Sequence, residues 1–281
     1  MRCALAVPAV ALASVLALAG CSTTTQQSSG GRQQTGGVDS VDTGVGVTRS
    51  EITLGALTDH SGPFAQLGHG VVQGNQIWIN ETNADGGICG RKIELQVRDH
   101  GYSASKAKIQ YSELAPTVLG FMHVVLGSPV SAALSQELLY NETTVVALSQ
   151  SSQLLDNPYL VIPGATYDVE MINGLSHLMG QGTLLDGDTI GHIWVDGEYG
   201  ANALRGTQYF AERHRLTVRD VKVASTDSDL RGVVAGFAGD PRVKAIALST
   251  TPAQTATVAE ANQQLGLNVP MVANNPAFGP R

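Results

Sequence analysis

Short apolar segments alternate with longer segments of helical periodicity from Glu51 almost to the end of the chain. The short segments read as buried strands, and we expect strands at 52–57, 93–98, 121–126, 144–148, 159–162, 189–195, 217–223, 243–248 and 269–272. We expect helices at 71–82, 104–118, 132–140, 168–179, 202–213, 230–238 and 252–265. This regular alternation is typical of parallel sheets covered by helices, so the predicted fold class is α/β.

The alternation runs through the chain twice and is divided near Pro163-Gly164-Ala165. We therefore expect two Rossmann-like lobes with parallel sheets, an N-terminal lobe over residues 49–164 and a C-terminal lobe over residues 165–281. Ligands of open α/β sheets bind outside the carboxyl ends of the strands. In a two-lobed protein the cleft between the lobes is the natural site. The loops that follow the strands are the candidate functional segments.

The N-terminus has the pattern of a lipoprotein export signal. An apolar run from Ala4 to Ala19 follows Arg2 and leads into Leu18-Ala19-Gly20-Cys21, with Leu three residues before the cysteine. The run is shorter than the ~20 residues needed to span a bilayer. We expect a signal peptide over residues 1–20, lipidation of Cys21, and a flexible tether over residues 21–48 that is rich in Ser, Thr, Gln and Gly. The folded part is then held at the extracytoplasmic face of a cell membrane, and an uncleaved N-terminal anchor is the alternative.

Composition argues against several classes of function. Charged residues make up 15% of the chain and the formal net charge is −7, without a Lys/Arg cluster, which argues against a nucleic-acid partner. Once Cys3 and Cys21 are set aside, only Cys89 remains in the folded part, so no internal disulfide is expected. The histidines lack metal-ligand spacing, there is no Gly-x-Ser-x-Gly elbow, and Gly68 to Gly74 only nearly matches a dinucleotide loop. We therefore expect no metal, no cofactor and no enzymatic activity.

One predicted helix start has the chemistry of an anion site. Ser128 is placed to act as the N-cap and Pro129 stands in the first turn, so the amides of Val130 and Ser131 are expected to be free at the positive end of the helix dipole. Such a terminus binds anions. From these residues alone, an ordinary capped helix is the alternative interpretation.

Three motifs near the start of the folded part occur in a characteristic order. They are the turn Ser61-Gly62-Pro63, the turn from Asn83 to Ile88 with its two glycines, and the strand entry Gly90-Arg91-Lys92-Ile93. With the segment from Val195 to Gly200, they resemble the branched-chain amino-acid (leucine/isoleucine/valine) binding proteins of ABC transporters, over about residues 50–276. The resemblance implies a type I periplasmic-binding-protein fold that closes on a small solute and delivers it to ABC permease subunits.

The resemblance also implies ligand-binding residues in the loops after strands, at Ser131, Ser151, Ser152, Tyr199, Thr250 and Asn275. Ser131 matches a serine that grips the ligand's carboxylate, and the pair Ser151 and Ser152 matches a loop that holds the carboxylate and the amino group. Tyr199 matches an aromatic side chain that closes over the ligand. Thr250 matches a binding tyrosine in position but not in type.

The ligand stays open because of Asn275, which stands where amino-acid binders of the family have a carboxylate. An ammonium group in a closed cleft is costly without an anionic partner. An amide, a urea-like solute or a small organic acid therefore remains as plausible as a branched-chain amino acid. Asp196 or Glu198 is the alternative source of the negative charge.

Two interpretations other than a transport protein also stay open: a receptor module and a lipoprotein without a ligand. The same fold serves as a ligand-sensing receptor module, although a lipid tether without a spanning helix favours transport. Family members continue past the position of Arg281, so the resemblance implies that the second lobe and the return segments are incomplete. If those segments are absent, a surface lipoprotein that binds no ligand is the other interpretation.

Overall fold

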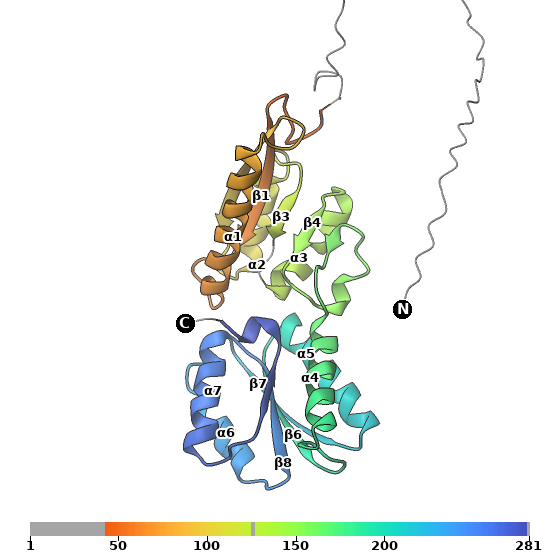
Figure 1. Cartoon of the computed structure of the whole chain (residues 1–281), viewed down its shortest axis with the longest axis vertical. Coiled ribbons are helices and arrows are strands. Elements are labelled where there is room, and N and C mark those ends of the chain that lie inside the picture. The colour runs from red at the N-terminus through yellow and green to blue at the C-terminus, as the bar shows by residue number, and fades with distance from the viewer. Residues whose placement is uncertain (1–42, 125–126, 280–281) are drawn as a thin grey trace, which may run out of the picture. The chain divides into compact units, whose positions relative to one another are not determined.

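The computed structural model describes residues 43–124 and 127–279 (Figure 1). The predicted signal peptide, the lipidation site Cys21 and most of the predicted tether lie outside the described residues. Within the described part of the chain, no helix combines the length and the apolarity needed to cross a membrane. Strands and helices alternate and build two parallel sheets, which confirms the α/β prediction.

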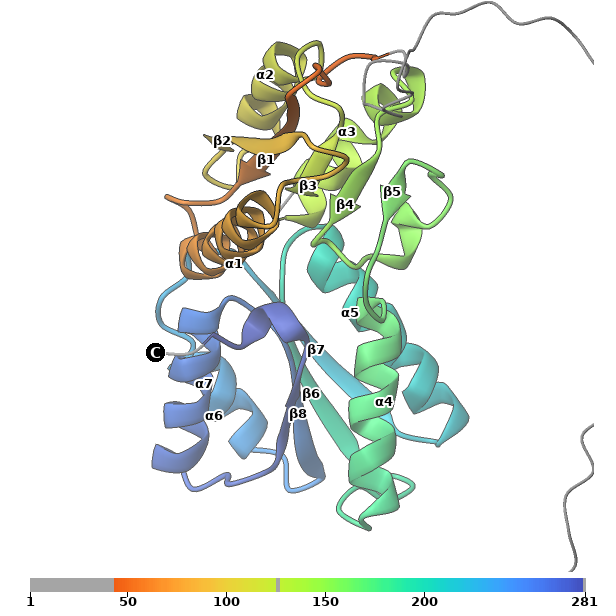
Figure 2. The ribbon, with the colours of Figure 1, turned by 45° about the horizontal axis from the view of Figure 1, so that its top comes forward.

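The first sheet has the strand order β2-β1-β3-β4-β5, and all its neighbours pair in parallel. Its strands are β1 (Glu51–Thr58), β2 (Lys92–Asp99), β3 (Phe121–Val124), β4 (Val145–Ala147) and β5 (Leu160–Val161). The connecting helices are α1 (Ala65–Ala84), α2 (Ala104–Leu114) and α3 (Ser128–Tyr140). Buried residues such as Tyr111 and Leu134 join α2 and α3 to one face of the sheet, and α1 runs along the other face (Figure 2).

The second sheet has the order β7-β6-β8-β9 and is also parallel throughout. Its strands are β6 (Thr189–Val195), β7 (Thr217–Val223), β8 (Val243–Ser249) and β9 (Met271–Ala273). Helices α4 (Tyr167–Gly180) and α5 (Glu198–Arg213) cover one face, and α6 (Arg231–Ala238) and α7 (Pro252–Gln264) cover the other (Figure 1). Along β8, Ala245 and Ala247 pack with α4 and α5, whereas Ile246 and Leu248 pack with the opposite helices. A strand covered on both faces must be apolar almost throughout, as β8 is.

Four helices begin earlier than the sequence predicted: α1, α3, α4 and α5. Helix α1 begins at Ala65 instead of Val71, and α5 begins at Glu198 instead of Asn202. The glycines in these first turns suggested loops, but they serve close packing. A Cβ at Gly68 would lie 2.0 Å from the carbonyl oxygen of Asp59, at the end of the preceding strand. Glycine there lets a helix start directly behind the strand that feeds it.

The other boundaries differ by a few residues. Helix α2 ends at Leu114 instead of Val118, because Pro116 has no N–H with which to continue the helical hydrogen bonds. Strand β9 begins at Met271, after Pro270, which has no N–H for the ladder. The short 3₁₀ turns Ser152–Leu154 and Asn275–Ala277 were not predicted. The division of the folded part at residues 164 and 165 stays a prediction, since the described residues form one compact unit.

The imidazole of His192 is completely buried in the second sheet. Its Nε2 lies 3.0 Å from Ser249 Oγ, which in turn donates to Asn274 Oδ1 at 2.8 Å. Burial lowers the pKa of His192 from 6.5 to about 3. Between these pH values the unfolded chain binds a proton that the folded chain does not, so His192 costs stability as the pH falls below about 6.5.

The free energy of unfolding should therefore fall more for the wild type than for His192→Gln between about pH 7.5 and about pH 5. We expect a difference of about 2 kcal/mol, measured by urea unfolding at both pH values. His177→Gln, which removes an exposed imidazole on α4, is the matched control and should keep the wild-type pH dependence. A wild-type pH dependence in His192→Gln would contradict the account.

Candidate ligand-binding site

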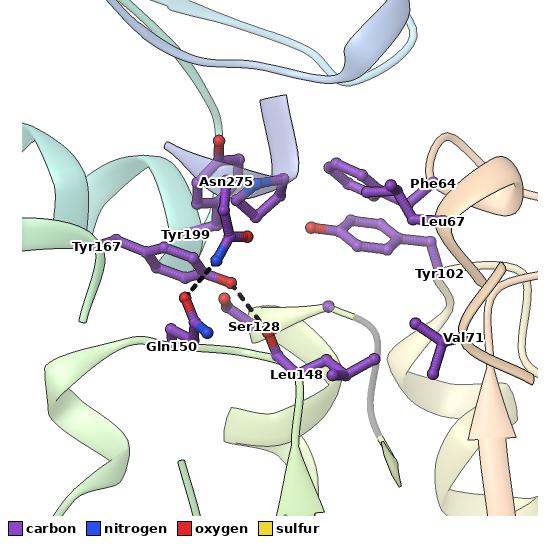
Figure 3. Close-up of a pocket in the computed structure, with 12 residues that line it drawn as sticks. Phe64, Leu67, Val71, Tyr102, Ser128, Leu148, Gln150, Tyr167, Tyr199 and Asn275 are labelled. Atoms are coloured by element: carbon purple, nitrogen blue, oxygen red, sulfur yellow. Dashed lines mark hydrogen bonds between the residues drawn. The ribbon is translucent and has the colours of Figure 1, made fainter. Parts of the chain in front are cut away.

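The carboxyl ends of the two sheets border a cavity of about 180 Å³ (Figure 3). Its walls come from the start of α1, the turn after β2, the start of α3 and the loop after β4 on the side of the first sheet. The first turns of α4 and α5 and the 3₁₀ turn after β9 complete it. This is the edge at which open α/β sheets bind their ligands.

One wall of the cavity is apolar and the opposite wall is polar. Phe64, Leu67 and Val71, at the start of α1, form the apolar wall, at the right of Figure 3. The polar wall carries hydroxyl and amide groups, at Ser128, Gln150 and Asn275. Among the described residues that line the cavity there is no Asp, Glu, Lys, Arg or His. The site can hold an apolar body against α1 and a polar group against neutral donors and acceptors.

Tyr102, Tyr167 and Tyr199 also line the cavity. The ring centroids of Tyr167 and Tyr199 lie 4.7 Å apart, and those of Phe64 and Tyr102 lie 5.0 Å apart. Burial raises the pKa of all three tyrosine hydroxyls, so they stay protonated at neutral pH and can donate hydrogen bonds. The hydroxyls of Tyr167 and Tyr199 donate to backbone carbonyls only at 3.5 Å, which is long enough for a ligand to compete.

A carboxylate behind the polar wall orients its amides. Glu170 of α4 accepts from Asn274 Nδ2 at 3.0 Å and from both Asn275 N and Asn275 Nδ2, at 3.2 and 3.1 Å. Asn275 Nδ2 also donates to Gln150 Oε1 at 2.5 Å, which joins the end of the second sheet to the loop after β4. Both hydrogens of Asn275 Nδ2 are thereby used, and its Oδ1 turns toward the cavity (Figure 3).

The start of α3 differs from the prediction. Gly127, with φ of 128°, is the N-cap, and Ser128 is the first helical residue. The amides of Val130 and Ser131 both donate to the Gly127 carbonyl at 3.0 Å, so the expectation that they are free for an anion was wrong. The buried Ser131 hydroxyl donates to the same carbonyl, at 3.3 Å. It is Ser128 that lines the cavity, and its hydroxyl accepts from Ser149 Oγ at 2.6 Å.

Ser151 and Ser152 make hydrogen bonds within the protein. Ser151 Oγ donates to Glu198 Oε1 at 2.5 Å, and Ser152 Oγ donates to Asp168 Oδ2 at 2.7 Å. Asn202 Nδ2 donates to Ser152 Oγ at 2.7 Å. These bonds tie the loop after β4 to the starts of α4 and α5. Neither serine is among the residues that line the cavity, and a ligand contact for them stays a prediction.

Tyr199 and Asn275 are the two sequence-predicted residues that the structure places at the cavity. Thr250 is completely buried behind it and reaches the site only through its carbonyl, which accepts from the Tyr199 hydroxyl. Asp196 forms an ion pair with Lys222 at 3.4 Å. Neither Asp196 nor Glu198 lines the cavity. In the part of the chain that the structure describes, no cluster of His, Cys, Asp or Glu is arranged to hold a metal ion.

Tyr102, Gln150 and Tyr167 line the cavity but were not predicted from the sequence. Gln150 stands two residues after a predicted strand, and Tyr102 stands four residues after another. Tyr167 comes one residue before a predicted helix. An aromatic or amide side chain just beyond a strand was therefore the available signal, because that is where the sheet edge lies.

Comparison with known protein families shows which family has this sequence and fold. A family model described as periplasmic binding protein matches residues 51–280. The chain belongs to this family. The motifs of a periplasmic binding protein were thus interpreted correctly, and the type I fold of two parallel sheets is confirmed. Comparison with curated proteins found no match.

Solved structures of other binding proteins are similar to this one. A fatty acid ABC transporter substrate-binding protein from Thermomonospora curvata is 40% identical, with a TM-score of 0.83 and with 86% of this chain and 62% of that chain covered. A branched chain amino acid ABC transporter protein from Thermus thermophilus with bound valine is 14% identical, with a TM-score of 0.73, and 82% and 60% are covered. A solute binding protein from R. palustris in complex with 4-hydroxybenzoate is 18% identical, with a TM-score of 0.70, and 81% and 62% are covered. This binding protein therefore spans less than two thirds of the length of these relatives.

The backbone at Gly127 permits the contact between α3 and Tyr102. A Cβ at position 127 would lie 2.7 Å from Tyr102 Cε2, and φ there is 128°. Gly127→Ala should therefore lower the free energy of unfolding by about 1–3 kcal/mol, measured by urea unfolding.

Gly74→Ala is the matched control for this prediction. Gly74 lies inside α1, and a Cβ added there would meet no atom within 4 Å apart from the backbone of its own helix. Alanine at this position should therefore raise stability by up to about 1 kcal/mol. Equal stability of the wild type and Gly127→Ala would rule out the tight contact at α3.

Proposed function

We propose that this periplasmic binding protein is the solute-binding component of an ABC importer, and that its ligand is a small apolar carboxylic acid. The observation that carries the proposal is the cavity itself, with an apolar wall opposite hydroxyl and amide groups and without a charged side chain among its described lining residues. The name of the Thermomonospora curvata protein, a fatty acid substrate-binding protein at 40% identity, supports the same class of ligand. The proposed role is binding, without catalysis.

A carboxylate is favoured by the helix that starts at Ser128. Helices α1, α3, α4 and α5 all begin at the cavity, and the N-terminus of a helix carries a partial positive charge. Helices α4 and α5 have acidic residues in their first turns, whereas α3 has none. The start of α1 already has an anionic partner, because the amide of Phe64 donates to the carboxylate of Asp59 at 2.9 Å. A carboxylate beside Ser128 is therefore close to the positive end of α3, and the neutral tyrosine hydroxyls can donate to it.

An amino acid is disfavoured because its ammonium group has no anionic partner among the described residues that line this cavity. The carboxylate behind the polar wall, Glu170, already accepts hydrogen bonds from Asn274 and Asn275. Burying an unpaired ammonium is costly, whereas burying an apolar group of the same size is favourable. Leucine and valine should therefore bind more weakly than acids of similar volume that lack the amino group.

The volume of the cavity limits which carboxylic acids can bind. Its volume of about 180 Å³ is close to that of an apolar protein cavity of about 150 Å³ that holds benzene. A monocyclic aromatic acid or a short-chain fatty acid fits this space, whereas a long-chain fatty acid does not. Benzoate and hexanoate are therefore the ligands of choice for a test.

We further propose that the protein is exported and held at the membrane through a lipid on Cys21, with residues 22–48 as a tether. Support comes from the sequence Leu18-Ala19-Gly20-Cys21 after an apolar run. ABC permease subunits at the same membrane are the proposed partners.

Benzoate or hexanoate should raise the thermal unfolding midpoint of residues 22–281, because a ligand of the folded state alone stabilises it. At a ligand concentration about a hundred times Kd the gain is about 2.7 kcal/mol, or several degrees for a protein of this size. The panel also contains benzamide, leucine and valine, which should give smaller shifts. A shift with leucine or valine but not with either acid would contradict the proposal.

The variant Asn275→Asp tests the same prediction from the protein side. A negative charge in the polar wall should weaken benzoate binding at least about tenfold and leave benzamide binding less affected. Asn268→Asp adds the same charge at an exposed position near the other end of β9 and is the matched control.

Lipidation is tested separately by metabolic labelling with a palmitate analogue. Cys21→Ala should lose the label, whereas Cys89→Ala, which removes the exposed free cysteine, should keep it. Label retained in Cys21→Ala would disprove lipidation at this residue.

A further inference from the structure

The turn after β2 holds Tyr102 in a backbone conformation that tyrosine rarely adopts. Gly101 and Tyr102 have φ angles of 57° and 63°, and Ser103 N donates to the His100 carbonyl at 3.0 Å to close the turn. Positive φ at both central positions is typical of a type I′ turn, which selects glycine, asparagine or aspartate. A tyrosine at the second position must therefore be stabilised by contacts beyond its own backbone.

The side chain of His100 makes such a contact. Its Nδ1 accepts from Tyr102 N at 2.9 Å, so this nitrogen carries no proton. The imidazole is completely buried, and its Nε2 has no hydrogen-bond partner among the described residues. The bond from residue 102 back to the side chain of residue 100 has the geometry by which Asn and Asp stabilise turns.

The conformation of Tyr102 determines the shape of the cavity. Its ring packs on Phe64 and lies against Gly127, where no Cβ would fit. Its hydroxyl points across the cavity toward Tyr199 and Asn275 (Figure 3). If the backbone at Tyr102 relaxed to negative φ, the ring would leave this position. The Tyr102 side chain would then no longer lie between the apolar wall and the polar wall of the cavity.

We propose that His100 is a positioning residue for ligand binding: the acceptor at its Nδ1 keeps Tyr102 in the left-handed conformation, and the Tyr102 ring then limits which acids the cavity admits. This inference rests on the proposed function, because the ring selects ligands only if the cavity binds them. His100 itself does not line the cavity.

The contact requires a neutral imidazole, because a protonated Nδ1 cannot accept. The charged and titratable groups around His100 are Asp59, Asp99, Lys106 and His60, and burial outweighs the two carboxylates and lowers the pKa of His100 to about 4. Ligand binding should therefore be insensitive to this group at neutral pH and should weaken as the pH approaches about 4.

The test compares two substitutions with the wild type. His100→Leu replaces the imidazole with an apolar side chain and so removes the hydrogen-bond acceptor. His100→Asn keeps an acceptor, which can accept from the backbone amide two residues later. Benzoate and hexanoate affinities are measured by calorimetry, and the exchange rate of the Tyr102 amide hydrogen is measured by NMR without ligand. We expect about tenfold weaker binding and faster Tyr102 exchange in His100→Leu. His100→Asn should restore both to within about threefold, and only the wild type should show the additional loss of affinity near pH 4.

Equal affinity of His100→Leu and the wild type would overturn the inference, as would equal losses in both variants. If the wild type binds neither acid, the proposed function fails, but the exchange rate of the Tyr102 amide still decides whether His100 holds the turn. Should His100→Leu not fold, the tautomer of His100 in the wild type decides, from its ¹⁵N chemical shifts. An Nδ1 that carries the proton would overturn the inference.

Discussion

The parallel pairing within both sheets is the constraint on which the site depends. Because neighbouring strands run in the same direction, the loops and helix starts that follow them meet at one edge of each sheet. Phe64, Tyr102, Ser128 and Gln150 come from four successive connections of the first sheet, and Tyr199 follows β6 of the second. Residues spread over much of the chain thereby line a single cavity of about 180 Å³. No single motif could have built this site.

The carboxylates near the cavity are hydrogen-bonded to neighbouring groups, and none of them is among the described residues that line it. Glu170 is held by the amides of Asn274 and Asn275, and Glu198 accepts from Ser151. The same hydrogen bonds connect the loop after β4 with α4, α5 and the turn after β9. An interior of this kind gives an ammonium group no partner, but it offers hydroxyl donors to a carboxylate. Under the proposed function, ligand selection and the connection between the two sheets would use the same set of side chains.

Much of the fold could be predicted from the sequence, because buried parallel strands such as β8 are marked by nearly continuous apolar runs. The helix starts were predicted less well, since Gly68 and Gly200 look like loop residues until their contacts with the preceding strand are known. Of the residues expected from the family resemblance, Tyr199 and Asn275 line the cavity. The hydroxyl of Ser131, in contrast, is turned to the carbonyl of its own helix cap, a choice that side-chain spacing alone does not reveal. Nothing in the sequence except Gly101 indicated the unusual backbone of Tyr102.

The orientation of the ligand tests the central claim most directly. Crystals grown with 4-bromobenzoate give an anomalous signal that locates the bromine independently of the protein atoms. We expect bromine against Leu67 and Val71, with the carboxylate within hydrogen-bond distance of Ser128 and the tyrosine hydroxyls. Bromine at the polar wall, or a ligand bound away from this cavity, would contradict it.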